Sequence, residues 1–154
     1  MKGYRITTDI AEMNLPVIHG FLANSYWAQD IPVATLKRAM DNSLCLAVLT
    51  DIGEQVAFAR LITDRATYAY LADVFVVEWH RGKGLSKWMV QVMMQHPDLQ
   101  GLRRISLITK DANGLYAKFG FKPLAKPERF MEVWNPGVYQ SEFIKTPPPE
   151  DSTQ

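Results

Sequence analysis

The sequence predicts a single α/β domain built on a mixed sheet with helices packed on its faces. Its 154 residues are 47% hydrophobic and 21% charged, which suits one soluble core of ordinary size. Apolar residues alternate in some segments and recur every three or four positions in others, so strands and helices are expected to alternate along the chain. We expect one domain over residues 1–144 and a flexible, Pro-rich tail over 145–154.

The first part of the chain predicts one strand and two helices. A strand is expected over residues 4–9, and helices over 15–25 and 33–42, where apolar residues fall at helical spacing. Pro32 stands at a plausible start of the second helix. A loop over 25–32 joins the helices.

The middle of the chain predicts three strands and the most regular helix. Strands are expected over residues 44–50, 55–63 and 68–77, the first two joined by a hairpin. After a turn, the helix begins at Leu85 and ends before His96–Pro97. Two methionines on its apolar face, Met89 and Met93, are interpreted as core residues.

The last part predicts a strand, a helix and two further strands. The strand covers 103–109, and the helix covers 112–119, with Asp111 favoured as its cap. Gly120 ends that helix. The final strands are expected around 121–124 and 129–134.

Composition excludes several classes of function. Seventeen Lys and Arg residues balance 16 Asp and Glu residues, so we expect no nucleic-acid partner. The one cysteine, Cys45, lies in an apolar run, and the three histidines lack metal-ligand spacing, so we expect no bound metal. No apolar stretch is long enough to span a bilayer and the first residues do not resemble a secretory leader, so a cytoplasmic protein without membrane contact is expected.

The segment Arg81–Ser86 is the most informative part of the sequence. A strand runs into a turn with two glycines, and the turn opens a helix whose first N–H groups lack helical acceptors. Gly82 and Gly84 let a phosphate approach the backbone, and Arg81 and Lys83 add positive charge. A pyrophosphate site is predicted, although a plain surface turn is the alternative.

Three motifs in this chain resemble those of the GCN5-related N-acetyltransferase (GNAT) superfamily. Arg81-Gly82-Lys83-Gly84-Leu85-Ser86 is similar to its Gln/Arg-x-x-Gly-x-Gly/Ala signature, with Ser86 departing at the last position. Asp73–Val76 resembles the fourth strand of the family, and Leu115–Phe121 resembles its Leu-Tyr-x-x-x-Gly-Phe element. The resemblance is firm over residues 55–123, and the order of elements extends it over about 4–134.

The resemblance implies a mostly antiparallel sheet that splays at the fourth strand, and direct transfer of an acetyl group from acetyl-CoA to an amine. The aromatic loop 25–32 favours a small-molecule amine as the acceptor. Tyr116 is implied to protonate the leaving thiolate, and a backbone N–H near Val76 to stabilise the thioester oxygen. Residues implied to contact the cofactor are Val74, Phe75, Val76, Arg81, Gly82, Lys83, Gly84, Leu85, Ser86 and Asn113.

Two polar residues of this site have open roles. Asp73 is the nearest carboxylate for taking the amine proton, because the preceding acidic position of the polyamine-acetylating branch is Ala72 here, but a structural role is the alternative. The asparagine that the family carries seven positions before the tyrosine is Thr109 here. Asp111 and Asn113 lie nearby and are both candidates to compensate, with Asn113 as the candidate cofactor contact.

The acceptor side rests on the loop 25–32, which walls the acceptor pocket in this family. Tyr26 and Trp27 are candidate acceptor contacts through cation–π attraction, with helix packing as the alternative. A protein N-terminal or lysine acetyltransferase and a non-catalytic acyl-CoA-binding module remain alternative functions. A homodimer through residues 129–144 is also expected from the family.

Overall fold

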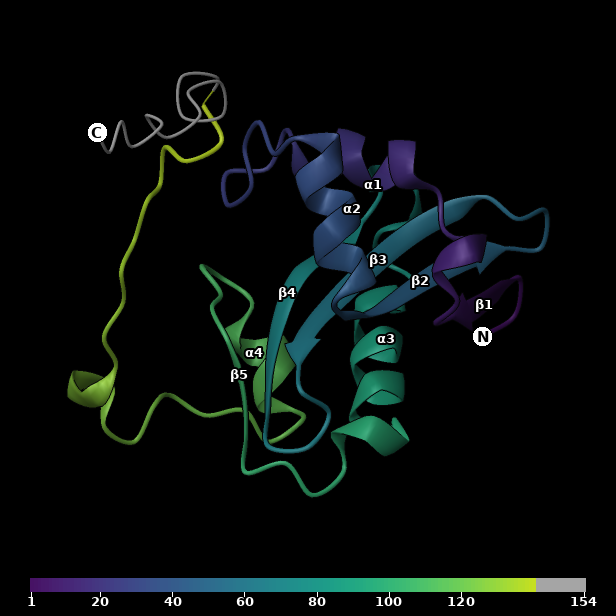
Figure 1. The fold of residues 1–154 in the computed structure, drawn as a ribbon. Helices are drawn as coiled ribbons and strands as arrows, with labels where there is room; N and C mark the ends of the chain where they lie inside the picture. Colours follow the sequence, from purple (N-terminus) through teal and green to yellow (C-terminus); the bar gives the residue numbers. More distant parts are fainter. Residues whose placement is uncertain (141–154) are drawn as a thin grey trace, which may run out of the picture.

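A five-stranded mixed sheet forms the centre of the molecule in a computed structural model that describes residues 1–140 (Figure 1). The strands lie in chain order: β1 (Tyr4–Thr7), β2 (Leu44–Thr50), β3 (Gln55–Thr63), β4 (Tyr68–Val76) and β5 (Arg104–Leu107). The first four pair antiparallel, and β5 runs parallel to β4. The predicted mixed, mostly antiparallel sheet is therefore confirmed.

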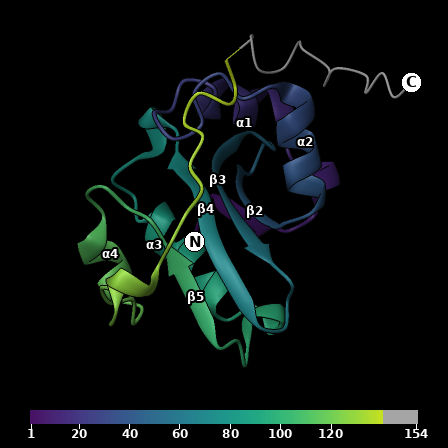
Figure 2. The ribbon, with the colours of Figure 1, turned by 60° about the vertical axis from the view of Figure 1, so that its left-hand side comes forward.

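Helices cover both faces of this sheet. The helices α1 (Leu15–Leu22) and α2 (Val33–Asp41) lie on one side, and α3 (Leu85–Met94) lies on the other (Figures 1 and 2). A short helix, α4 (Asn113–Ala117), follows β5. Four 3-10 turns complete the described elements, at Ile10–Glu12, Glu78–His80, Pro97–Leu99 and Pro127–Arg129.

Two apolar clusters hold the layers together. The larger lies between the sheet and α3, where Met89 and Met93 are fully buried, as predicted. The smaller lies between the sheet and the α1–α2 pair, and contains Cys45, Phe58 and Phe75. Residues of β2 contribute to both clusters, because successive side chains of a strand point to opposite faces of the sheet. The chain thus positions β4, which carries the predicted site, between two packed layers.

The helices α1 and α4 differ in how their N-termini are capped. Asn14 caps α1 as its side chain accepts a hydrogen bond from Val17 N–H at 3.1 Å. The predicted cap at Asp111 is wrong. The helix begins at Asn113, one residue later than expected, so Ala112 holds the N-cap position and no side chain caps the helix. Thr109 Oγ1 accepts the N–H of Ala112 at 3.0 Å in the turn before the helix.

The two predicted last strands do not form, which is the main correction to the predicted fold. Residues 121–124 and 129–134 contain no strand, and β5 has β4 as its only partner within residues 1–140. Residues 122–140, here called the C-terminal arm, instead extend along one side of the molecule (Figure 1). The composition of 129–134 favours a strand, but a strand needs a partner, and none is paired with this segment here.

The predicted tail 145–154 lies outside the described residues. Within the described 1–140, no helix combines the length and apolar character required to cross a lipid bilayer.

Candidate functional site

Strand β4 is bent and partly unpaired at the point where the sequence places the cofactor. Opposite β3, Asp73 and Val74 occupy the place of one residue, and Asp73 has a positive φ of 57°. This is a β-bulge, which bends the strand. The pairing of β4 with β5 ends at Leu71 and Leu107, while the pairing with β3 continues to Val76. The predicted splay of the fourth strand is thus present.

The splay leaves backbone groups of β4 facing an open space. Val77 N–H donates to Val56 O of β3 at 2.9 Å. Because hydrogen-bonding direction alternates along a strand, the N–H of Val76 points away from β3. This amide is therefore available on the side where β5 has separated from β4.

The turn after β4 leaves several backbone amides without acceptors at the start of α3. Gly82 and Gly84 have positive φ values of 77° and 80°, which suit glycine and strain other residues. The first hydrogen bond of the helix runs from Trp88 N–H to Gly84 O at 3.0 Å. The N–H groups of residues 85–87 therefore lack helical acceptors and face an incoming anion with the positive end of the helix dipole.

Side chains brace this turn from two directions. Arg81 Nε donates to Val76 O at 2.9 Å, which ties the turn to the end of β4. On the other side, Tyr4 Oη pairs with His80 Nδ1 at 2.7 Å and accepts from Lys83 Nζ at 3.2 Å. The cradle is thus held by both the first and the fourth strand.

One large cleft brings most of the predicted site residues together. Its volume is about 1120 Å³, and its walls come from β4, the turn before α3, the chain after β5, α4, the loop 25–32 and the C-terminal arm. The predicted residues in its lining are Tyr26, Trp27, Asp73, Val74, Phe75, Val76, Arg81, Gly82, Gly84, Leu85, Ser86 and Tyr116.

Two predicted residues lie outside this lining. The ammonium group of Lys83 is directed to Tyr4, 5.8 Å above its ring, and Asn113 lines a second cavity on the far side of α4. The side chain at the family's asparagine position, Thr109, does line the main cleft, together with Asp111.

Tyr116 presents a phenol to the cleft from a nearly buried position. The residue is 8% exposed, and its ring packs edge-on against Phe121 at 5.9 Å. Burial raises the pKa of Tyr116 above its ordinary value near 10, because the phenolate would lose its hydration. The phenol therefore stays protonated at neutral pH and can donate a hydrogen bond.

Asp73 is held by two partners on either side of its carboxylate. Its Oδ2 accepts from Arg60 Nε at 2.8 Å and its Oδ1 accepts from Trp27 Nε1 at 3.0 Å. Arg60 also donates to Ser43 Oγ at 3.1 Å. Both charged side chains are largely buried, so the pair joins β3 to the bulge of β4 and anchors the loop 25–32.

The loop 25–32 forms one wall of the cleft, as predicted. Trp27 is 43% exposed, and its ring packs edge-on against Tyr26. The ring of Tyr26 faces Lys110 Nζ at 5.4 Å, so this loop meets the chain after β5. In this wall, Trp27 is fixed by its hydrogen bond to Asp73, and the ring of Tyr26 lies against the ammonium group of Lys110.

Sequence reasoning missed several residues of this site. Arg60 is separated from Asp73 by 13 positions and meets it only through the β3–β4 register. Tyr70 lines the same cleft, and its pKa is raised mainly by burial. Glu132 and Trp134 reach the cleft from the C-terminal arm. Only Tyr70 has a signal in the sequence. Side chains two positions apart on a strand share a face of the sheet, so Tyr70 is expected on the same face as Ala72.

No metal-binding cluster of three or more His, Cys, Asp or Glu side chains occurs in the part of the chain that the structure describes. Cys45 is buried, and burial raises the pKa of its thiol to about 12. Such a thiol stays protonated and has little nucleophilic character.

Comparisons with known proteins agree with one another. The model of the acetyltransferase (GNAT) family matches residues 12–121. A candidate acetyltransferase of Gibberella zeae is 32% identical, over 75% of this chain and 76% of its own length.

Solved structures extend this similarity to the fold. A candidate GNAT acetyltransferase of Xanthomonas campestris is 50% identical, with a TM-score of 0.88 over 92% of this chain and 99% of that one. A GNAT N-acetyltransferase of Escherichia coli, solved in complex with CoA, is 20% identical. Its TM-score is 0.58, and the match covers 77% of this chain and 67% of that one.

Proposed function

Because this chain belongs to the acetyltransferase (GNAT) family, we propose that it moves an acetyl group from acetyl-CoA to a primary amine of a small molecule. One observation carries the proposal. A single cleft joins a cradle of free amides, an unpaired strand edge and a protonated phenol. Those are the parts needed to bind a phosphate-bearing thioester, hold its carbonyl group and protonate its thiolate.

The cradle takes the pyrophosphate of acetyl-CoA in this proposal. The amides after Gly84 supply hydrogen bonds, while Arg81 and the hydroxyl group of Ser86 lie in the same wall. The edge of β4 from Val74 to Val76 then runs beside the pantetheine arm. The CoA bound to the Escherichia coli relative supports this choice of co-substrate. Lys83 contributes through its backbone N–H, and Asn113 remains a predicted contact.

The chemistry is a direct attack. The amine nitrogen forms a bond to the thioester carbonyl carbon, and the outward N–H of Val76 stabilises the oxygen that becomes negative. The carbon–sulfur bond then breaks, and Tyr116 donates its hydroxyl hydrogen to the thiolate. The two reactants need little more than correct positioning, so no covalent enzyme intermediate is involved.

Asp73 helps to remove the proton of the attacking amine. Its two oxygens hold Arg60 and Trp27, yet a carboxylate has about four acceptor sites, so two remain. A water molecule bound there accepts the proton and passes it outward.

The acceptor pocket lies between Tyr26, Trp27 and the end of the splay. A cationic amine fits this region because it holds two aromatic faces and two carboxylates, Asp73 and Glu132. Lys110 Nζ lies 5.4 Å from the centre of the Tyr26 ring, so the loop 25–32 meets the chain after β5, and a pocket closed by loops favours a small molecule over a peptide. In this proposal the enzyme works in the cytoplasm, where acetyl-CoA is made available.

Turnover of acetyl-CoA tests the proposal. Purified protein is incubated with acetyl-CoA and a panel of amino acids, polyamines, aminoglycosides and peptides, and free thiol is measured. We expect thiol release with one class of small amine, and the acetylated amine in the mass spectrum. Release with peptides alone contradicts the small-molecule acceptor, and no acetyl-CoA binding by calorimetry contradicts the function itself.

A further inference from the structure

His80 lies between the end of β4 and the cradle. It is the last residue of the 3-10 turn Glu78–His80, and the turn that opens α3 follows it directly. Its backbone N–H donates to Val77 O at 3.0 Å, so the main chain is fixed at this point. The residue is half-buried and lines the main cleft, as do its neighbours Arg81 and Gly82. The reaction steps described above give its imidazole no role.

Two other side chains hold one nitrogen of this imidazole. Lys83 Nζ lies 3.2 Å from Tyr4 Oη, and Tyr4 Oη lies 2.7 Å from His80 Nδ1. An ammonium group can only donate, so the oxygen of Tyr4 accepts from Lys83 and keeps its own hydrogen for His80. The distance of 2.7 Å also suits a hydroxyl donor better than an N–H donor, which usually lies about 2.9 Å from its acceptor. Tyr4 therefore donates to His80 Nδ1.

The direction of that hydrogen bond determines the tautomer of His80. Because Nδ1 accepts, the hydrogen of the neutral imidazole is on Nε2. The rings of Tyr4 and His80 also meet edge to face, with 5.7 Å between centroids and 86° between planes, which fixes the plane of the imidazole. Nε2–H is thus a donor held in one orientation, and such a donor loses little conformational freedom when it binds a ligand.

The sheet topology places this donor toward the cleft. β1 and β5 are the opposite edges of the sheet, and the cleft opens where β5 separates from β4 (Figure 1). Tyr4, on β1, therefore approaches the imidazole from the side away from that separation. The two nitrogens of an imidazole point in widely different directions, so a ring whose Nδ1 is held from the β1 side has Nε2 on the side of the cleft.

We propose that His80 Nε2 donates a hydrogen bond to a pyrophosphate oxygen of acetyl-CoA, and that Tyr4 and Lys83 are positioning residues for this donor. The inference rests on the proposed function, because it takes acetyl-CoA as the ligand. The amides of residues 85–87 contact the anion from the start of α3, and the imidazole adds a donor from the preceding turn. The ammonium group of Lys83, which is directed to Tyr4, then acts on the cofactor through Tyr4 and His80.

Nitrogen NMR of the isotope-labelled protein without ligand tests the tautomer. The other two histidines are internal references. His19 Nε2 lies 2.8 Å from Ile31 O, which can only accept, and His96 Nδ1 accepts from Asp98 N–H at 3.1 Å, so each is an Nε2–H tautomer when neutral. We expect His80 to give the same pattern in mildly alkaline buffer. An Nδ1–H tautomer of His80 overturns the proposal, whether or not CoA binds.

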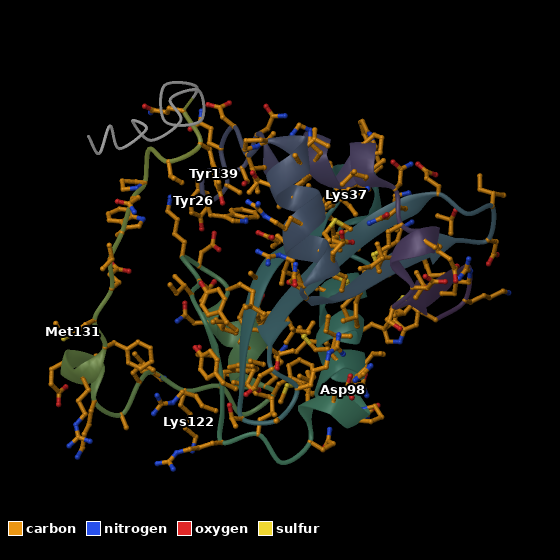
Figure 3. All side chains as sticks on the ribbon, viewed as in Figure 1. Tyr26, Lys37, Asp98, Lys122, Met131 and Tyr139 are labelled. Atoms are coloured by element: carbon orange, nitrogen blue, oxygen red, sulfur yellow. The ribbon has the colours of Figure 1, made fainter. Side chains whose placement is uncertain are left out.

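Addition of CoA to the same sample tests the contact. The Nε2 signal of His80 should shift, whereas that of His96 should not. His96 is bonded to Asp98, and Figure 3 shows Asp98 at the opposite end of the molecule from Tyr26 of the main cleft. An unshifted His80 signal in protein that binds CoA overturns the contact and leaves the proposed function intact. A protein that does not bind CoA by calorimetry overturns both.

Two substitutions of His80 separate the donor from the packing. Glutamine places an amide N–H near the position of Nε2, whereas asparagine places its amide near that of Nδ1 and falls short of the cleft. We expect His80→Gln to keep the Kd of CoA within about twofold of the parent value, and His80→Asn to raise it about tenfold, because a hydrogen bond to a charged group is lost. Equal affinities of the two variants overturn the proposal.

Dephospho-CoA identifies the phosphate that His80 contacts. This probe keeps the pyrophosphate and lacks only the ribose phosphate, so the difference between His80→Gln and His80→Asn should be the same as with CoA. A difference that is present with CoA and absent with dephospho-CoA assigns His80 to the ribose phosphate and overturns the assignment to the pyrophosphate.

Tyr4→Phe tests the positioning role. Phenylalanine keeps the ring beside His80 and removes the hydroxyl group, so we expect a mixture of His80 tautomers and a several-fold weaker affinity for CoA. The same change in the His80→Asn background should have no further effect on affinity. The matched control is Tyr68→Phe, which removes the hydroxyl partner of Ser106 at the start of β4 and should change neither quantity. A Tyr4→Phe protein with the parent tautomer and the parent affinity overturns the role of Tyr4.

Discussion

The hydroxyl group of Tyr116 is the only feature that distinguishes its proposed role as an acid from a role in packing. The ring packs against Phe121 and is almost buried, so phenylalanine satisfies the packing. We expect Tyr116→Phe to lower kcat about 10²-fold while leaving the Kd for acetyl-CoA and the Tm nearly unchanged. Steady-state kinetics, calorimetry and thermal melting measure the three quantities.

A second phenol in the same cleft is the matched comparison for Tyr116. Tyr70 is partly buried on β4, and burial raises its pKa as well. We expect Tyr70→Phe to change kcat much less than Tyr116→Phe does. Equal losses in the two variants, or a Tyr116→Phe enzyme with the parent rate, remove Tyr116 as the specific acid.

Asp73 and Arg60 form one buried ion pair, so a variant of either residue loses the same contact and the two variants can be compared. Asp73→Asn and Arg60→Gln both break the buried ion pair, and each should lower the free energy of unfolding by about 3 kcal/mol or more. Only Asp73→Asn removes the carboxylate. We expect it to lower kcat at least tenfold more than Arg60→Gln does, because only the carboxylate can hold the water that accepts the amine proton. Equal rate losses in the two variants give Asp73 a purely structural role.

The parts of this site that are contiguous in the chain can be predicted from the sequence, whereas contacts between distant residues cannot. The cradle could be predicted because its glycines, its basic residues and the start of α3 are contiguous. The contact of Tyr4 with His80 spans 76 positions and depends on how β1 lies in the sheet. The same holds for Arg60, since only strand register decides which side chain meets Asp73.

At the scale of the element, the junction between β4 and α3 is defined by backbone conformation. Gly84 has a φ of 80°, and a Cβ built on it meets only Met1 Cε at 3.7 Å, so backbone strain matters more than crowding. We expect Gly84→Val to weaken acetyl-CoA binding more than tenfold, equivalent to about 1.4 kcal/mol, by shifting the amides of the cradle. Calorimetric titration measures this affinity.

Gly53 provides the control for this strain. Its φ is 81°, it sits in the β2–β3 hairpin and a Cβ there meets nothing within 4 Å. Gly53→Val should therefore cost comparable stability while leaving acetyl-CoA affinity at the parent value. If Gly84→Val also binds acetyl-CoA normally, the pyrophosphate does not sit at the start of α3.

The periodic elements were predictable and the last strands were not. The apolar spacing of α1, α2 and α3 reports burial directly, so their existence follows from the sequence within a few residues at their ends. Composition also favours a strand over 129–134, but strand formation requires pairing with another strand. The local sequence contains no information on whether that partner lies in the same chain.

At the scale of the whole molecule, the thiol of Cys45 makes stability depend on alkaline pH. Burial raises its pKa from 9.0 when unfolded to about 12 when folded. The full stability is present below pH 9, and it is lost as pH rises from 9 toward 12, because the unfolded chain releases the proton first. This loss is on the order of 3 kcal/mol at pH 11.

Replacement of the thiol isolates this effect from other titrating groups. Cys45→Ala removes the proton but leaves the remaining side chains as they are. Urea unfolding of both proteins at pH 8 and pH 11 should show that the stability advantage of the parent shrinks at the higher pH. A difference between the two proteins that is independent of pH shows that the thiol ionises equally in both states.

The separation of β4 from β5 has a consequence for how the two substrates meet. The cleft that opens where β4 and β5 separate is lined by both the cradle and the loop 25–32, so in the proposed reaction the donor and the acceptor bind to different parts of one cleft. Both can occupy the protein at once, and neither must leave before the other enters. Initial rates measured over a grid of both concentrations should then give intersecting lines in double-reciprocal plots. Parallel lines, the pattern of a ping-pong cycle, would mean that the acetyl group rests on the protein between two half-reactions.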